Sequence, residues 1–94
     1  MSHFDDVDDQ INAFVKSRGL KLIKEHMDWD VRIMLHNYKP ELRDGEHTIQ
    51  VSPPNPKRNY YNVCVWGLKM DKKCFPAQKD DLATVLEEAW KLFG

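Results

Sequence analysis

The sequence predicts an α+β fold: a two-layer sandwich in which an N-terminal helix, four or five antiparallel strands and a C-terminal helix follow one another. Three observations predict it. Apolar residues recur at steps of three and four near both ends of the chain, they alternate with polar residues in the middle, and the connections are short. Ninety-four residues make a single domain over residues 1–94. Since each helix has one apolar face, both are expected on one face of the sheet, which leaves the other face uncovered.

The first predicted helix covers residues 3–18. Its apolar residues at helical spacing are Phe4, Val7, Ile11, Phe14 and Val15. The segment Ser2-His3-Phe4-Asp5 resembles a capping box, and the aspartates that follow suit the positive end of a helix dipole. Gly19 is a natural residue for the left-handed position that ends a helix. These features predict both ends of this helix.

Period-two alternation predicts the strands. A short strand begins at Leu20 and Leu22, and a longer one covers residues 29–36, ended by Lys39-Pro40. After the turn-like Asp44-Gly45, strands are expected over residues 47–51 and 60–68. Residues 69–77 are ambiguous between a loop and a fifth strand that ends near Pro76. A helix over residues 79–93 closes the chain, and its apolar stripe is Leu82, Val85, Leu86, Ala89 and Phe93.

The uncovered sheet face is the expected working surface. Alternation is expected to turn Val31, Ile33 and Leu35 toward the helices, and Tyr61, Val63 and Val65 likewise. The side chains at the alternate positions of both strands, including Asn62 and Cys64, then face outward. From this outward set, the predicted partner-binding residues are Arg32, Met34, His36, Tyr38, Tyr60 and Trp66. Such residue types are enriched in protein interfaces. Two alternatives stay open: the strand over residues 60–68 has the opposite orientation, or the helices cover opposite faces.

These expectations favour a small non-enzymatic protein-binding module: an inhibitor, adaptor or regulator of the kind found in phage and bacterial genomes, acting on a protein partner or by self-association as a homodimer. The alternative is a nucleic-acid-binding module. Its contacts are Lys57, Arg58, Tyr60 and Tyr61, which follow three prolines in SPPNPKRNYYN. A net charge of −1 gives no electrostatic footprint for nucleic acid, so a stiff connector with Lys57 and Arg58 exposed at its tip is favoured for this loop.

The helix–sheet–helix order also resembles the double-stranded RNA-binding domain. That family carries a lysine cluster at the start of its second helix, where this chain has Gln78-Lys79-Asp80-Asp81. Those two aspartates would repel phosphates, so the resemblance is not extended to RNA binding.

Enzymatic and metal chemistry are not predicted. No histidine or cysteine pair has the spacing of a metal site, and no motif places a nucleophile, base and oxyanion hole together, so the expectation is no catalytic residue, no metal and no cofactor. The chain has no long apolar run and no basic signal peptide, which predicts a cytoplasmic protein without a membrane partner. In that compartment Cys64 and Cys74 are expected to be free thiols.

Overall fold

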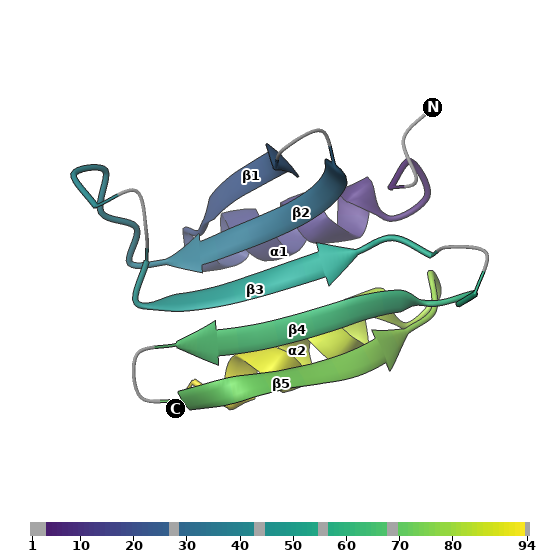
Figure 1. Ribbon diagram of the computed structural model, residues 1–94. Coiled ribbons are helices and arrows are strands. Elements are labelled where there is room, and N and C mark those ends of the chain that lie inside the picture. The colour runs from purple at the N-terminus through teal and green to yellow at the C-terminus, as the bar shows by residue number, and fades with distance from the viewer. Residues whose placement is uncertain (1–3, 27–28, 43–44, 55–56, 68–69, 94) are drawn as a thin grey trace.

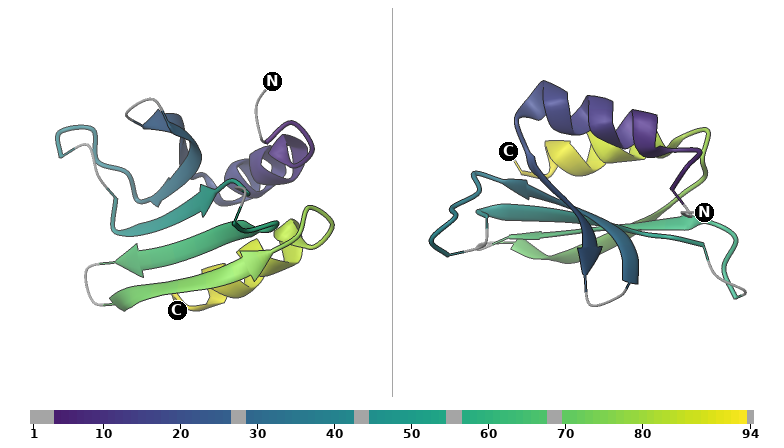
Figure 2. Two further views of the ribbon diagram at one scale, coloured as in Figure 1. Left: turned by 45° about the vertical axis from the view of Figure 1, so that its right-hand side comes forward. Right: turned by 90° about the horizontal axis from the view of Figure 1, so that it is seen from above.

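Two helices lie side by side on one face of a five-stranded antiparallel sheet (Figures 1 and 2). The computed structural model describes residues 4–26, 29–42, 45–54, 57–67 and 70–93. The elements are α1 (Asp8–Arg18), β1 (Lys21–His26), β2 (Trp29–His36), β3 (His47–Ser52), β4 (Tyr61–Gly67), β5 (Met70–Ala77) and α2 (Leu82–Lys91). This confirms the predicted α+β sandwich with both helices on one sheet face, which the right-hand view of Figure 2 shows most directly.

The strands follow one another across the sheet in the order β1-β2-β3-β4-β5, as short connections predict. Residues 69–77, which the sequence left ambiguous between a loop and a fifth strand, form the edge strand β5 (Met70–Ala77) over their described part. Pro76 is tolerated there because an edge strand can spare a ladder donor on its outer side. The other edge is β1, whose pairing with β2 is interrupted by an irregularity between Ile23 and Glu25.

Helix α1 is shorter than predicted at its N-terminus. It begins at Asp8 instead of residue 3, because Phe4 to Val7 form a tight turn in which the Phe4 carbonyl accepts from the amides of Val7 (2.9 Å) and Asp8 (2.7 Å). The proposed capping box includes residues 2 and 3, which lie outside the described residues. The predicted C-terminus is confirmed: Gly19 has φ +63° and its amide bonds to the Val15 carbonyl.

Helix α2 receives its N-terminal cap from α1. The Gln10 side chain accepts from the amide of Ala83 (3.0 Å) and donates to the carbonyl of Lys79 (2.7 Å). An otherwise unpartnered first-turn amide is thereby satisfied by another helix. At the other end of the pair, Arg18 forms an ion pair with Glu87. These contacts tie the two helices to each other directly, in addition to their packing on the sheet.

The core lies between the helices and the inner sheet face. The described core side chains are Phe4, Val7, Ile11, Phe14, Leu20, Met34, Ile49, Val51, Tyr61, Val63, Val65, Ala77, Leu82, Leu86 and Ala89. Burial is the first cause that raises the pKa of Tyr61, with the carboxylates of Asp6 and Asp8 adding to it. Among the described residues, no helix is both long enough and apolar enough to cross a membrane.

Candidate functional site

The orientation of β2 is the reverse of the prediction. Met34 is 1% exposed and belongs to the core beneath the helices, and Arg32 on the same side is 4% exposed. Ile33, predicted to face the core, therefore lies on the outer face. The predicted partner-binding roles of Arg32 and Met34 are corrected accordingly, because neither side chain is accessible on the uncovered face.

Arg32 can occupy an inner position because its charge is fully accommodated there. Its Nε and Nη2 donate to the two carboxylate oxygens of Asp8 at 2.8 and 3.0 Å, and Nη1 donates to the carbonyls of Lys24 (3.0 Å) and Val31 (3.1 Å). The guanidinium also lies 4.3 Å from the ring centre of Phe4. A buried guanidinium with these partners costs far less than an unpaired one. The side of β2 that carries Val31, Ile33 and Leu35 can therefore face away from the helices, although Val31 and Leu35 are still only 5% and 4% exposed.

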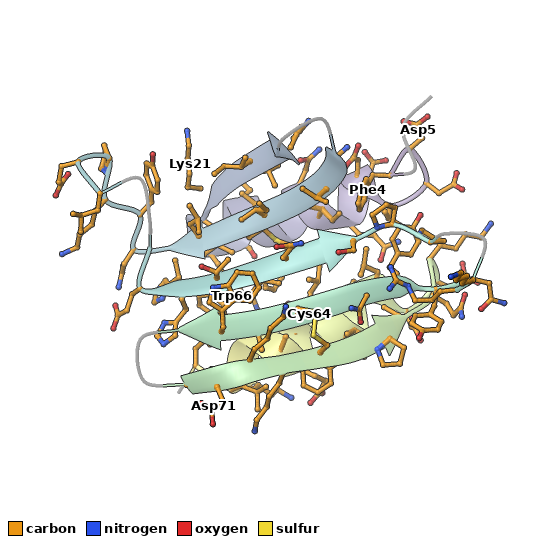
Figure 3. All side chains as sticks on the ribbon, in the orientation of Figure 1. Phe4, Asp5, Lys21, Cys64, Trp66 and Asp71 are labelled. Carbon is orange, nitrogen blue, oxygen red and sulfur yellow. A yellow bond between two sulfur atoms is a disulfide. The ribbon has the colours of Figure 1, made fainter. Side chains whose placement is uncertain are left out.

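The orientation of β4 is as predicted. Tyr61, Val63 and Val65 lie in the core, so Cys64 and Trp66 face away from the helices, as Figure 3 shows. Paired residues of adjacent strands share a face, and the register gives one continuous outer row: Ile23, Ile33, Gln50, Cys64 and Cys74. Trp66 lies in the neighbouring row, opposite Thr48. We call these six residues the open-face patch: Ile23, Ile33, Gln50, Cys64, Trp66 and Cys74.

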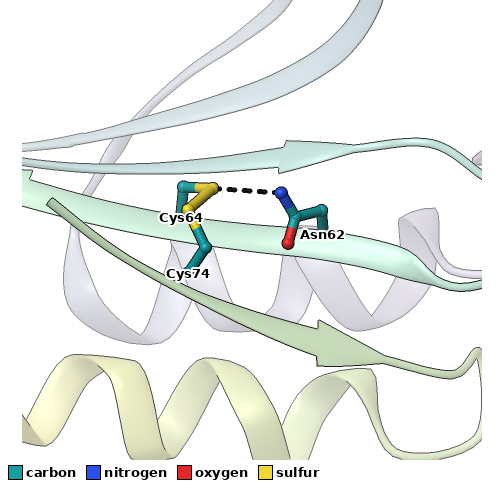
Figure 4. Close-up of a disulfide and its surroundings, with 3 residues drawn as sticks. All are labelled: Asn62, Cys64 and Cys74. Carbon is teal, nitrogen blue, oxygen red and sulfur yellow. Dashed lines mark hydrogen bonds between the residues drawn. A yellow bond between two sulfur atoms is a disulfide. The ribbon is translucent and has the colours of Figure 1, made fainter.

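A disulfide joins the last two strands within this patch. Cys64 and Cys74 are direct cross-strand partners with Cα atoms 4.0 Å apart, and the Asn62 amide donates to Cys64 Sγ at 3.3 Å (Figure 4). The prediction of free thiols was wrong. It rested on the small number of cysteines and on an expected reducing compartment, and it did not consider that the register of β5 places Cys74 directly opposite Cys64.

Cations border the open-face patch. The amino group of Lys72 lies 5.6 Å from the ring centre of Trp66, and that of Lys21 lies 5.6 Å from the ring centre of Tyr38. Trp66 and Tyr38 are both partly exposed, and Tyr38 lies just beyond the end of β2. The surface therefore combines aromatic and aliphatic side chains with a lysine at two of its borders.

The proline loop is internally tied. Arg58 donates to the carbonyls of Pro53 (2.9 Å) and Tyr60 (3.3 Å), and its guanidinium lies 5.5 Å from the Tyr60 ring centre. Lys57 is exposed as expected, but Arg58 is partly buried, which corrects the expectation that both lie exposed at the tip. Tyr61 is 7% exposed and packs on Phe4, so it is not available to stack on a base.

His36, also predicted to face outward, lies on the inner side of β2 at its end. It pairs directly with His47 of β3, and the two Nδ1 atoms are 3.3 Å apart. Glu46 precedes His47, and ligand atoms from these three residues lie within 4.8 Å of one another. The Asn37 side-chain amide donates to Glu46 at 2.6 Å, and this hydrogen bond is the main cause that lowers the pKa of the Glu46 carboxyl.

The sequence analysis missed most of the open-face patch and also the cluster of His36, Glu46 and His47, for the same reason. Both are products of strand register, which places Ile33 opposite Gln50 and His36 opposite His47. In β2 both alternating sets contain apolar residues, so the pattern does not select a face. No family model matches the sequence, and no curated protein or solved structure is significantly similar to it.

Proposed function

We propose that this chain is a small, non-enzymatic protein-binding module, an inhibitor, adaptor or regulator, whose interface is the open-face patch. One observation carries the proposal: a partly exposed tryptophan lies on a sheet face over which the described part of the chain places no helix or strand. A solvated sheet face ordinarily carries polar side chains. Here Trp66 and Ile33, both partly exposed, share this face with the exposed Cys74, while Cys64 at the other end of the disulfide is 6% exposed.

The composition of the open-face patch supports a protein partner over a small molecule. Apolar side chains make up most of this surface, Gln50 lies on its middle strand, β3, and Lys21 and Lys72 lie at its borders. Large aromatic residues at the centre of such a surface contribute most of the binding energy, and border charges mainly guide encounter and orientation. The partner is therefore expected to bring an apolar centre flanked by carboxylates, or to be a second copy of the chain.

The proline loop does not favour the nucleic-acid alternative. Arg58 makes its hydrogen bonds and ring contact within the loop, and Tyr61 is buried. Phosphate binding relies on several accessible cations on one surface, whereas this loop presents an exposed Lys57 beside an Arg58 already engaged in holding the loop together.

The test compares Trp66→Ala with Leu42→Ala, which truncates a side chain that is 69% exposed outside the open-face patch. Self-association is measured by sedimentation velocity over a concentration series. Partners captured from the native host are purified, and their affinity for each variant is measured directly. Trp66→Ala is expected to weaken association by about 2 kcal/mol, or about 30-fold in Kd, while Leu42→Ala leaves it unchanged.

Gln50→Glu provides a second variant in case Trp66→Ala perturbs the sheet. It places a negative charge in the middle of the row, facing a partner expected to bring carboxylates, and it is expected to weaken association. A Kd that is unaffected by both changes, in variants whose unfolding curves match the wild type, would refute the proposed interface. Equal weakening in Leu42→Ala would show that the association is unspecific.

A further inference from the structure

The cluster of His36, Glu46 and His47 lies on the opposite side of the sheet from the open-face patch. We propose that these three side chains form a binding site for a divalent transition-metal ion of the zinc type, with one coordination position left for water or an external ligand. The inference does not depend on the proposed protein-binding function.

The spacing of the two imidazoles matches a shared metal. Two nitrogens bound to one zinc ion at about 2.0–2.1 Å in tetrahedral geometry lie about 3.3–3.4 Å apart. The Nδ1 atoms of His36 and His47 are 3.3 Å apart, with the rings nearly parallel at an interplanar angle of 20°. Cross-strand pairing holds both backbones in this arrangement, so the two nitrogens are positioned by the sheet itself.

The carboxylate is also prepared for a ligand role. Asn37 donates to one oxygen, Oε2, which leaves Oε1 for a metal. A carboxylate binds a metal in its ionised form, and an imidazole binds one in its neutral form. Glu46 is exposed and its backbone amide is anchored to the His36 carbonyl at 2.8 Å, so its side chain can close on an ion without moving the strand.

Two glycines make room for the cluster. A Cβ atom on Gly67, the cross-strand partner of His47, would lie 2.5 Å from Cδ2 of the His47 ring. A Cβ atom on Gly45 would lie 2.6 Å from the carbonyl oxygen of His36. Both distances are below those that real Cβ atoms show, so each glycine permits a close approach that any other residue would push apart.

Aromatic rings from α2 and the turn after it hold the imidazoles in place. The Phe93 ring stacks on His47 with centres 4.4 Å apart, and the edge-on ring pair of Trp90 and His36 has centres 5.1 Å apart. These contacts restrict rotation of both ligands and exclude water from one side. Two imidazoles and one carboxylate suit zinc, cobalt, nickel or copper rather than magnesium or calcium, which prefer oxygen ligands.

The sequence predicted no metal site because no ligands are close along the chain in a recognised spacing. The separation of ten residues between His36 and Glu46 is bridged by the β2–β3 connection, and the strand register then aligns the histidines. The alternative is a pair of histidines that share a proton through a direct hydrogen bond, with no affinity for metal.

The test uses the untagged full chain, stripped with a chelator and titrated with zinc ion alone by calorimetry and with cobalt ion alone by visible absorption. Zinc is expected to bind with one-to-one stoichiometry, cobalt to give the absorption of a nitrogen- and oxygen-ligated site, and magnesium to give no signal. The side-chain NMR signals of His36 and His47 are expected to shift with the first equivalent of zinc.

Four variants separate a built site from surface binding. Losing a supporting hydrogen bond at a metal site typically costs about 10–100-fold in affinity, so His47→Gln and Glu46→Gln are each expected to weaken zinc binding by at least that factor. Asn37→Gly removes the hydrogen bond to Glu46 while keeping a residue that accepts φ +54°, and it is expected to weaken binding about 10-fold. Glu41→Gln changes an exposed carboxylate outside the cluster and is expected to have no effect.

Since Glu46 is exposed, Glu46→Gln should fold normally and keep the proposal testable even if His47→Gln destabilises the sheet. Zinc affinity that is the same in wild type, His47→Gln and Glu46→Gln would overturn the site. The absence of any zinc response in the wild type would also overturn it, and a single exchangeable proton shared between His36 and His47 would then identify them as a hydrogen-bonded pair.

Discussion

The ion pair between Arg32 and Asp8 should contribute more to stability than an ordinary helix-terminal carboxylate does. The Arg32 side chain is 5% exposed and that of Asp8 is 24% exposed, so removing the carboxylate takes a charged partner away from a buried guanidinium. Breaking a fully buried pair in this way costs about 3–5 kcal/mol. We expect Asp8→Ala to lower the free energy of unfolding by about 2–3 kcal/mol, because Asp8 is partly exposed and two backbone carbonyls still accept from Arg32.

The matched control is Asp9→Ala, since Asp9 is an exposed acidic residue in the same first turn of α1. It should lose only the interaction with the helix dipole, about 0.3–1 kcal/mol. The free energy of unfolding is measured by urea denaturation for both variants and for Asp8→Ala in an Arg32→Met background. In the Arg32→Met background there is no buried guanidinium to lose its carboxylate, so Asp8→Ala should lower the free energy of unfolding by no more than Asp9→Ala does.

Equal costs for Asp8→Ala and Asp9→Ala in the wild-type background would refute this reasoning, because the pair would then contribute nothing beyond the dipole term. A full cost for Asp8→Ala in the Arg32→Met background would refute it differently, by showing that Asp8 stabilises the fold through some other partner.

Three further predictions follow from the fold. Leu86→Ala should cost about 2–5 kcal/mol of unfolding free energy, because Leu86 is 0% exposed in the core; a loss below about half a kcal/mol in urea denaturation would show that α2 is not docked. Reducing the disulfide between Cys64 and Cys74, which closes a short loop of sequence separation 10, should lower stability by about 2–3 kcal/mol; urea curves that coincide with and without reductant would contradict this. The proline loop should not bind short single- or double-stranded DNA or RNA at low salt; binding that falls steeply with salt and disappears in the Lys57→Ala, Arg58→Ala double variant would favour the nucleic-acid alternative.

The sequence by itself determined both helices, the first four strands, and the core residues contributed by the helices and β4. Helical periodicity near both ends and alternation between them specify the helices and strands because burial requires apolar residues to recur at the period of each structure. Gly19 specified the end of α1, since glycine adopts its left-handed conformation without steric cost. In β4 one alternating set is uniformly apolar, and the predicted orientation of Trp66 was therefore correct.

Tertiary structure alone decided the orientation of β2 and the register of the sheet. Both alternating sets of β2 contain apolar residues, and the choice between them rested on whether a buried Arg32 could find partners, which Asp8 supplies from another element. Register likewise brought Cys64 opposite Cys74 and His36 opposite His47. Such pairings join residues that are distant along the chain, and local periodicity carries no information about which residue of one strand lies beside which residue of the next.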